Sequence, residues 1–164
     1  KKDVQPRRPS RMYIALERDM AAEGPVACLH VRRGDYLNSP DWGLLTPEYY
    51  LAALESAGVV TAESQVWVFS DDPVGVGRAF PTRQFPTFRV VSELQMRPAA
   101  ETLCLMQKFA LKIIANSSLS WWAAILGEGR VIAPAPWYRT TDFANDRIPP
   151  DWTTREAVWD QGGN

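Results

Sequence analysis

The sequence is poor in the residues that build metal centres and disulfide networks. It has one histidine, His30, and two cysteines, Cys28 and Cys104, which are too few and too far apart for a zinc site. Both cysteines lie inside apolar segments, so we expect buried, reduced thiols. No apolar run approaches the roughly 20 residues that a membrane-spanning helix needs, and no signal peptide is recognisable.

Common nucleotide-binding and hydrolase motifs are also absent from the sequence. It contains no GxxxxGK[ST] P-loop, no GxGxxG after a predicted strand, and no GxSxG elbow. With 18 Lys and Arg against 19 Asp and Glu, the net charge is -1, which argues against a nucleic-acid partner. The 164 residues are 46% hydrophobic and 23% charged, as expected for one globular domain.

Short apolar runs alternate with helical patterns along the chain. Continuous apolar runs predict buried strands, and these lie at residues 26–31, 65–69, 88–91, 112–115 and 130–133. Helix signals fall before and between them, at residues 12–22, from Thr46 to Gly58, from Ser70 toward Phe80, from Pro98 onward and after Asn116. Strands that alternate with helices pair in parallel through right-handed crossovers. The expected fold is therefore α/β, a doubly wound parallel Rossmann-like sheet.

Three regions follow from this pattern. Residues 1–24 are expected to form a basic arm and a linking helix, and residues 25–135 the Rossmann-like domain. Residues 136–164 are rich in Pro and Trp without clear periodicity. We expect them to form an irregular tail packed on the domain, with at most one more short helix.

Polar clusters directly follow three of the predicted strands. The segment Arg32–Asp35 follows the first strand, Ser70–Asp72 the second, and Asn116–Ser118 the fourth. The carboxyl ends of parallel strands share one edge of the sheet, where ligands bind. The guanidinium groups of arginine can bind phosphate oxygens in a bidentate manner, and a helix N-terminus with serine hydroxyls also favours phosphate. A carboxylate can accept hydrogen bonds from two N–H groups of guanine. The set therefore predicts a site for a nucleotide diphosphate.

Several segments of the chain resemble one family of glycosyltransferases. They are His30–Tyr36 (HVRRGDY), Ser70–Asp72 (SDD), Ile113–Trp122 (IIANSSLSWW), Val131–Pro134 (VIAP) and Trp137-Tyr138. In this order they resemble the α-1,2-fucosyltransferases of glycosyltransferase family 11, over residues 12 to 152. The resemblance implies one half of a GT-B enzyme, namely the C-terminal half that binds GDP-fucose. The N-terminal half, which helps to shape the acceptor cleft, is expected to be missing.

The resemblance assigns roles in the first loop. Arg32 is expected to bind the β-phosphate of GDP and to stabilise the leaving diphosphate, which makes it the catalytic residue; the general base stays unassigned. Arg33 has two alternatives, phosphate binding or an ion pair with Asp35, and Asp35 is expected to be structural. His30 is expected to touch the guanine or the first phosphate loop by resemblance, although a hydrogen-bonded structural role is the default for a histidine inside a strand.

The second and fourth loops supply the remaining binding residues. Asp72 is expected to bind guanine and Asp71 to cap the following helix, with the two roles open to exchange. Asn116, Ser117 and Ser118 complete the donor-binding set, the serines either binding phosphate or capping the helix. Trp137 and Tyr138 have two alternatives, stacking on sugar or packing in the core.

The reaction implied is transfer of L-fucose from GDP-β-L-fucose to O2 of a galactoside, with inversion and without a metal or other cofactor. Two alternatives stay open: a GDP-sugar-binding module that transfers nothing alone, and a related fucosyltransferase with another acceptor. The expected partners are the donor and a galactoside-containing glycan, in glycan biosynthesis. The expected location is the cytoplasm with peripheral membrane association for a bacterial protein, or the Golgi membrane for a eukaryotic one.

Overall fold

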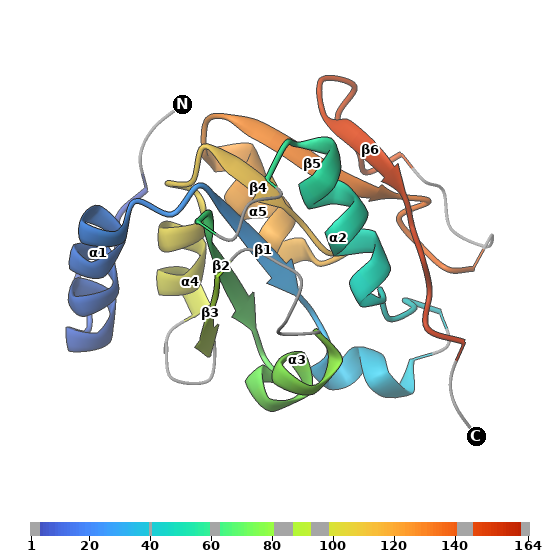
Figure 1. Cartoon of the computed structure of the whole chain (residues 1–164), viewed down its shortest axis with the longest axis horizontal. Helices are drawn as coiled ribbons and strands as arrows, with labels where there is room; N and C mark the ends of the chain where they lie inside the picture. The colour runs from blue at the N-terminus through green and yellow to red at the C-terminus, as the bar shows by residue number, and fades with distance from the viewer. Residues whose placement is uncertain are drawn as a thin grey trace.

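The described part of the chain forms six strands and six helical segments (Figure 1). The computed structural model describes residues 4–39, 41–59, 63–80, 87–92, 99–140 and 146–161. The helices are α1 (Arg11–Glu23), the 3-10 helix η1 (Gly34–Asn38), α2 (Pro47–Ser56), α3 (Pro73–Ala79), α4 (Ala99–Met106) and α5 (Ser118–Leu126). The strands are β1 (Ala27–Val31), β2 (Gln65–Ser70), β3 (Thr87–Ser92), β4 (Leu111–Ile113), β5 (Arg130–Ala135) and β6 (Thr153–Glu156). Pro98, the predicted start of a helix, and residues 1–3 of the predicted basic arm lie outside the described residues.

The strands form one six-stranded parallel sheet in the order β3-β2-β1-β4-β5-β6. Leu29 at the centre of β1 lies between Val68 of β2 and Ile113 of β4. The strand order reverses direction between β1 and β4, which is the switch point where doubly wound sheets bind ligands. The predicted α/β Rossmann-like fold is confirmed.

Helices cover both faces of the sheet because each central strand is apolar on both sides. In β2, Val66 and Val68 point into a cluster shared with α2 and α3, whereas Trp67 and Phe69 point into a cluster shared with α1, α4 and α5. Cys28 and Cys104 are both reduced thiols buried in the second of these clusters, as predicted. Burial raises the pKa of Cys28 to about 12, so this thiol stays protonated.

Polar residues cap the starts of α1 and α3, and a glycine ends α1. Ser10 caps α1 by accepting the N–H of Tyr13, and Gly24 closes the helix with φ of 58°, a left-handed conformation that suits glycine. Asp72 caps α3 by accepting the N–H of Gly75 at 2.8 Å. The predicted boundary between the second strand and the following helix is therefore confirmed.

The expectation of an irregular C-terminal tail is wrong at Thr153–Glu156. These residues form β6, which pairs in parallel with β5 and completes the sheet. All four side chains of β6 are exposed, so the strand forms through main-chain hydrogen bonds and carries no apolar pattern that sequence analysis could detect. Elsewhere in the tail, Trp137, Tyr138 and Trp152 pack against Ile114 and Ala133 in a third apolar cluster.

Candidate functional site

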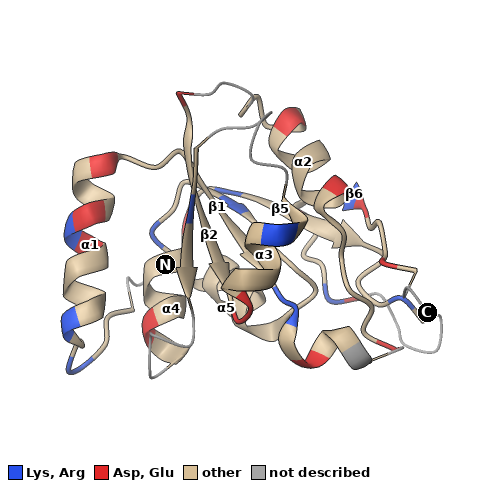
Figure 2. Cartoon of the chain, turned by 60° about the horizontal axis from the view of Figure 1, so that its bottom comes forward, with Lys and Arg blue, Asp and Glu red and all other residues tan. Residues whose placement is uncertain are grey.

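The loops that follow β1, β2 and β4 meet at one edge of the sheet. The arrowheads of β1 and β2 point toward α3 in Figure 1, and this end of the sheet comes forward in Figure 2. The main-chain N–H of Arg33 donates to Asp71 Oδ1 at 2.9 Å, which joins the first two loops. The hydroxyl of Tyr36 donates to the carbonyl oxygen of Asn116 at 3.0 Å, which joins the first loop to the loop after β4. The structure thus brings the predicted site segments together.

Arg32 lies at the centre of this edge, between two carboxylates. Its Nε donates to Asp35 Oδ1 at 3.0 Å, and its other guanidinium nitrogens lie 2.9 Å from Asp35 Oδ1 and 3.2 Å from Asp71 Oδ2. The Cζ atom lies 5.7 Å from the centre of the Tyr36 ring, within range of a cation–π contact. The side chain is 27% exposed. The guanidinium is therefore held in place and still open to solvent.

Arg33 has a different partner from the one proposed in the sequence analysis. Its Nε donates to Asp72 Oδ2 at 3.1 Å, while Asp35 pairs with Arg32. The suggested pair between Arg33 and Asp35 is therefore wrong, because Arg33 reaches Asp72 after β2 and Asp35 is taken by Arg32. Asp35 does hold the loop, as expected, through Arg32. Its side chain remains 67% exposed.

The cap of α3 comes from the second of the two aspartates that follow β2. Asp72, not Asp71, caps α3. The N–H of Gly75, followed by the Arg33 side chain, lowers the pKa of Asp72, so this carboxyl is ionised at neutral pH. Asp71 instead accepts from the main chain of Arg33 and pairs with Arg32.

Gly34 lets the first loop approach the second closely. A Cβ atom added at Gly34 would lie 2.3 Å from Asp71 Oδ2, which is too close for any carbon atom. Glycine at this position is therefore a requirement of the contact between the two loops.

The segment Asn116–Ser118 leads into α5 at the switch point. Asn116 is buried, and its Nδ2 donates to the carbonyl oxygen of Trp42 at 2.6 Å. Ser117 occupies the N-cap position without a side-chain capping hydrogen bond, so the structure does not support the capping alternative for Ser117. Ser118 is exposed at the first turn of α5 and lines a cavity.

His30 is more deeply buried than the other predicted site residues. It is fully buried in β1, on the same face of the strand as Cys28, and pairs in register with Phe69. This position fits the default expectation for a histidine inside a strand.

A cavity of about 510 Å³ opens beside Arg32 and Arg33, which together form the arginine cluster. Its wall is mostly aromatic, and its polar groups come from the loops after β1 and β4 and from the C-terminal segment. The lining residues are Asp35, Tyr36, Trp42, Asn116, Ser118, Trp121, Trp122, Trp137, Tyr138 and Arg147. Trp42 and Arg147 were missed by sequence analysis, since both lie in segments without periodicity.

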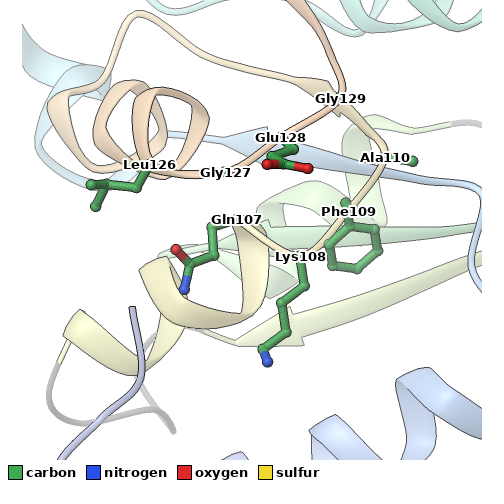
Figure 3. Close-up of a pocket in the computed structure, with 8 residues that line it drawn as sticks. All are labelled: Gln107, Lys108, Phe109, Ala110, Leu126, Gly127, Glu128 and Gly129. Atoms are coloured by element: carbon green, nitrogen blue, oxygen red, sulfur yellow. The ribbon is translucent and has the colours of Figure 1, made fainter. Parts of the chain in front are cut away.

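A second cavity of about 640 Å³ lies at the opposite edge of the sheet, between the turns that precede β4 and β5 (Figure 3). Lys108 and Glu128 are its charged lining residues. Buried Lys112 lies close by and donates to the carbonyl oxygens of Phe109 and Glu128. The predicted site residues all lie at the other edge, so the smaller cavity is the one that adjoins the candidate site.

Three further observations concern metal-binding groups, membrane-spanning helices and the distribution of charge. Across the described residues, no group of three or more His, Cys, Asp and Glu could hold a metal ion, and no described helix is long and apolar enough to cross a membrane. Basic and acidic residues are mixed across the molecule in Figure 2. The positive charge at the candidate site therefore comes from individual arginines.

Comparisons with known proteins agree with the fold. A model of the family described as Glycosyl transferase family 11 matches residues 15–156. The chain is similar to the O-antigen biosynthesis glycosyltransferase WbnK of Escherichia coli, with 35% identity over 117 residues, 67% of this chain and 38% of that protein. It is also similar to an alpha-1,2-colitosyltransferase of Escherichia coli, with 30% identity over 136 residues, 78% of this chain and 47% of that protein. In both cases the match covers less than half of the relative.

Proposed function

The chain belongs to glycosyl transferase family 11, and we propose that its arginine cluster binds the diphosphate of GDP-β-L-fucose. The complete protein would then transfer L-fucose, with inversion, to O2 of a galactoside. The observation that carries this proposal is the position of Arg32, a solvent-accessible guanidinium at the carboxyl end of β1, beside the switch point of the sheet. A guanidinium fork matches diphosphate oxygens in a bidentate manner.

The proposed chemistry is electrostatic. The acceptor oxygen attacks C1 of fucose while the bond from C1 to the diphosphate oxygen breaks, and GDP departs with the bonding electrons. Arg32 stabilises the negative charge that develops on the diphosphate. The N-terminus of α5, with Ser118 exposed beside it, adds N–H and hydroxyl donors on the other side. These groups supply the positive potential that a metal would otherwise provide, so the proposal includes no cofactor.

Guanine is assigned to the pair of aspartates after β2. Asp72 accepts one hydrogen bond on each oxygen, from Gly75 and from Arg33, and each oxygen keeps a further lone pair. The two N–H groups on one edge of guanine fit such a carboxylate, whereas uracil offers one. His30, Arg33, Asp71, Asn116 and Ser117 complete the proposed donor-binding set.

Two variations of this function stay within the same site. One relative is named as a colitosyltransferase, which makes colitose a second candidate for the transferred sugar. Since the chain covers less than half of either relative, it can also serve as a GDP-sugar-binding module whose transfer activity needs the rest of the protein.

Calorimetric titration with GDP and UDP tests the donor assignment. We expect GDP to bind more tightly than UDP, and Arg32→Ala to weaken GDP binding about 10- to 150-fold, because each lost charge-assisted hydrogen bond is worth roughly 1.5–3 kcal/mol. Arg89→Ala is the matched control. Arg89 is 28% exposed and bound by Asp19 and Glu23, but it lies on β3 against α1.

The control should bind GDP as the wild type does. Unchanged GDP affinity in Arg32→Ala, or equal affinity for GDP and UDP, would contradict the assignment. Melting temperatures of both variants separate a loss of binding from a loss of folding.

A further inference from the structure

We infer that the aromatic cavity beside η1 is the acceptor subsite and that it holds the galactose ring of the acceptor. This inference rests on the proposed function, because it places the second substrate beside the proposed diphosphate site. It adds an assignment for Trp42 and Trp122, to which the proposed function gives no role.

Three aromatic rings form a continuous wall along the cavity. Tyr36 and Trp42 are stacked, with ring centres 6.0 Å apart and planes 19° from parallel. Tyr138 follows, with its ring centre 5.5 Å from that of Trp42. The wall joins η1 to the segment after β5, and Asn116 fixes it from behind by donating to the carbonyl oxygen of Trp42. A pyranose ring presents a face of C–H groups that packs on such a surface.

Two large rings at the cavity are open to solvent. Trp122 is 51% exposed and Trp42 is 40% exposed, although each is large enough to contribute strongly to a core. Trp122 contacts Trp121 edge to face, with ring centres 4.9 Å apart, and lies in the middle of α5. Exposed aromatic rings that border a cavity are typical of a ligand-binding surface.

Polar groups at the cavity suit a neutral sugar. The Asp35 carboxylate is exposed and can accept hydrogen bonds from sugar hydroxyls, while Ser118 and Arg147 can donate to them. One acidic and one basic side chain line the cavity, so their charges balance. An uncharged ligand with many hydroxyl groups matches this lining better than a phosphate does.

The strand order places this cavity on the correct side of the arginine cluster. In a GDP-sugar the diphosphate lies between the guanine and the sugar. Asp71 and Asp72, the proposed guanine carboxylates, follow β2 on one side of β1, while the cavity is lined by residues that follow β1 itself and β4 and β5 on its other side. With the diphosphate on Arg32, the sugar and its acceptor therefore fall on the cavity side. Arg32 and the cavity meet at Tyr36 and Asp35.

Titration of the full chain with methyl β-D-galactoside, with GDP present at saturation, tests the inference. Saturation-transfer NMR is the readout, because it reports which sugar protons contact the protein. We expect saturable binding, with signal transferred mainly to the C–H groups of one ring face. Trp42→Ala and Trp122→Ala should each weaken it about five- to tenfold. Trp42→Phe should retain most of the affinity.

The controls separate this inference from the proposed function. Val74→Ala removes another exposed apolar side chain, on α3 outside the cavity lining, and should leave galactoside binding unchanged. The ring of Trp122 is exposed, and alanine is well tolerated in a helix. Trp122→Ala should therefore fold and still test the inference even if Trp42→Ala fails to fold. GDP affinity, measured in parallel, should be unchanged in both tryptophan variants.

Each remaining outcome overturns one of the two proposals. If GDP binds but the galactoside does not, or if the tryptophan variants bind it normally, the subsite assignment is wrong while the donor site stands. If GDP and the galactoside exclude one another, the cavity holds the nucleotide. If neither ligand binds, the proposed function itself fails.

Discussion

At the scale of single residues, Gly34 controls the contact between the loops after β1 and β2. In Gly34→Ala the new Cβ atom would collide with Asp71 Oδ2, which is tied to Arg32 and to the Arg33 main chain. We expect a loss of stability of about 1–3 kcal/mol and weaker GDP binding, measured by urea unfolding and calorimetry.

Gly77→Ala is the matched control for this change, since a Cβ atom at Gly77 meets nothing within 4 Å. Gly77 lies inside α3, where alanine should add about 0.5–1 kcal/mol of stability. If the two alanine variants unfold alike, the close approach at Gly34 does not constrain the loops.

Asp72 makes stability depend on pH at the acidic end of the scale. Its pKa is lowered from the ordinary value of 3.8 by the N–H of Gly75 and then by Arg33. A carboxyl with a depressed folded-state pKa stabilises the protein above its unfolded-state pKa, and the stabilisation is lost as pH falls through the folded-state value. Asp72→Ala should therefore cost about 0.5–2 kcal/mol at neutral pH.

The cost of Asp72→Ala should shrink as pH falls below 3.8. Urea unfolding of both proteins between neutral and acidic pH measures the difference. A difference that stays constant through this range would show that the ionised carboxylate does not stabilise the cap of α3.

At the scale of elements, Lys112 joins the ends of two helices. Its buried ammonium donates to the carbonyl oxygens of Phe109, after α4, and of Glu128, after α5. Lys112→Met would leave both oxygens without this donor and should destabilise the chain by about 1–3 kcal/mol. GDP affinity should not change, because Lys112 lies at the opposite edge of the sheet from Arg32.

Lys108→Met provides the comparison for Lys112. Lys108 is a neighbouring lysine whose ion pair with Glu17 is partly exposed, so its replacement should cost less than about 1 kcal/mol. Thermal unfolding of both variants measures the difference. Equal melting temperatures would contradict a special role for the buried ammonium.

Most elements could be predicted because each strand is a short apolar run bounded by turn residues. Val26 to Val31 and Gln65 to Phe69 are such runs, and their positions fixed which loops would meet at the carboxyl edge. β6 could not be predicted, since its four side chains are exposed and its strand depends on a main-chain partner, β5.

The partners of the site residues were harder to predict than the elements. Parallel topology places Arg32, Arg33, Asp35 and Asp72 at one edge, but not which arginine meets which aspartate. That choice depends on the twist of the chain as it leaves β1. Asp35 was considered as the partner of Arg33, whereas in the structure Arg33 pairs with Asp72 and Asp35 with Arg32. Trp42 joined the cavity through contacts made across the fold, for which local sequence has no signal.

At the scale of the whole molecule, the chain spans less than half the length of the two relatives that it matches. The match covers 38% and 47% of the two relatives. We expect residues 1–164 alone to bind GDP without transferring fucose from GDP-fucose to lactose. Mass spectrometry of the sugar products measures transfer, and trisaccharide formation by the isolated chain would contradict this expectation.

β6 also determines where the sheet ends. Its main chain covers the open side of β5, whose residues Val131, Ile132 and Ala133 are buried and strongly apolar. A chain cut before Thr153 would leave β5 as an uncovered edge with free N–H and C=O groups along an apolar strand. Such edges pair with strands of other molecules and promote aggregation. β6, with its four polar, solvent-facing residues, therefore protects β5 from pairing with other molecules, a role separate from binding and catalysis.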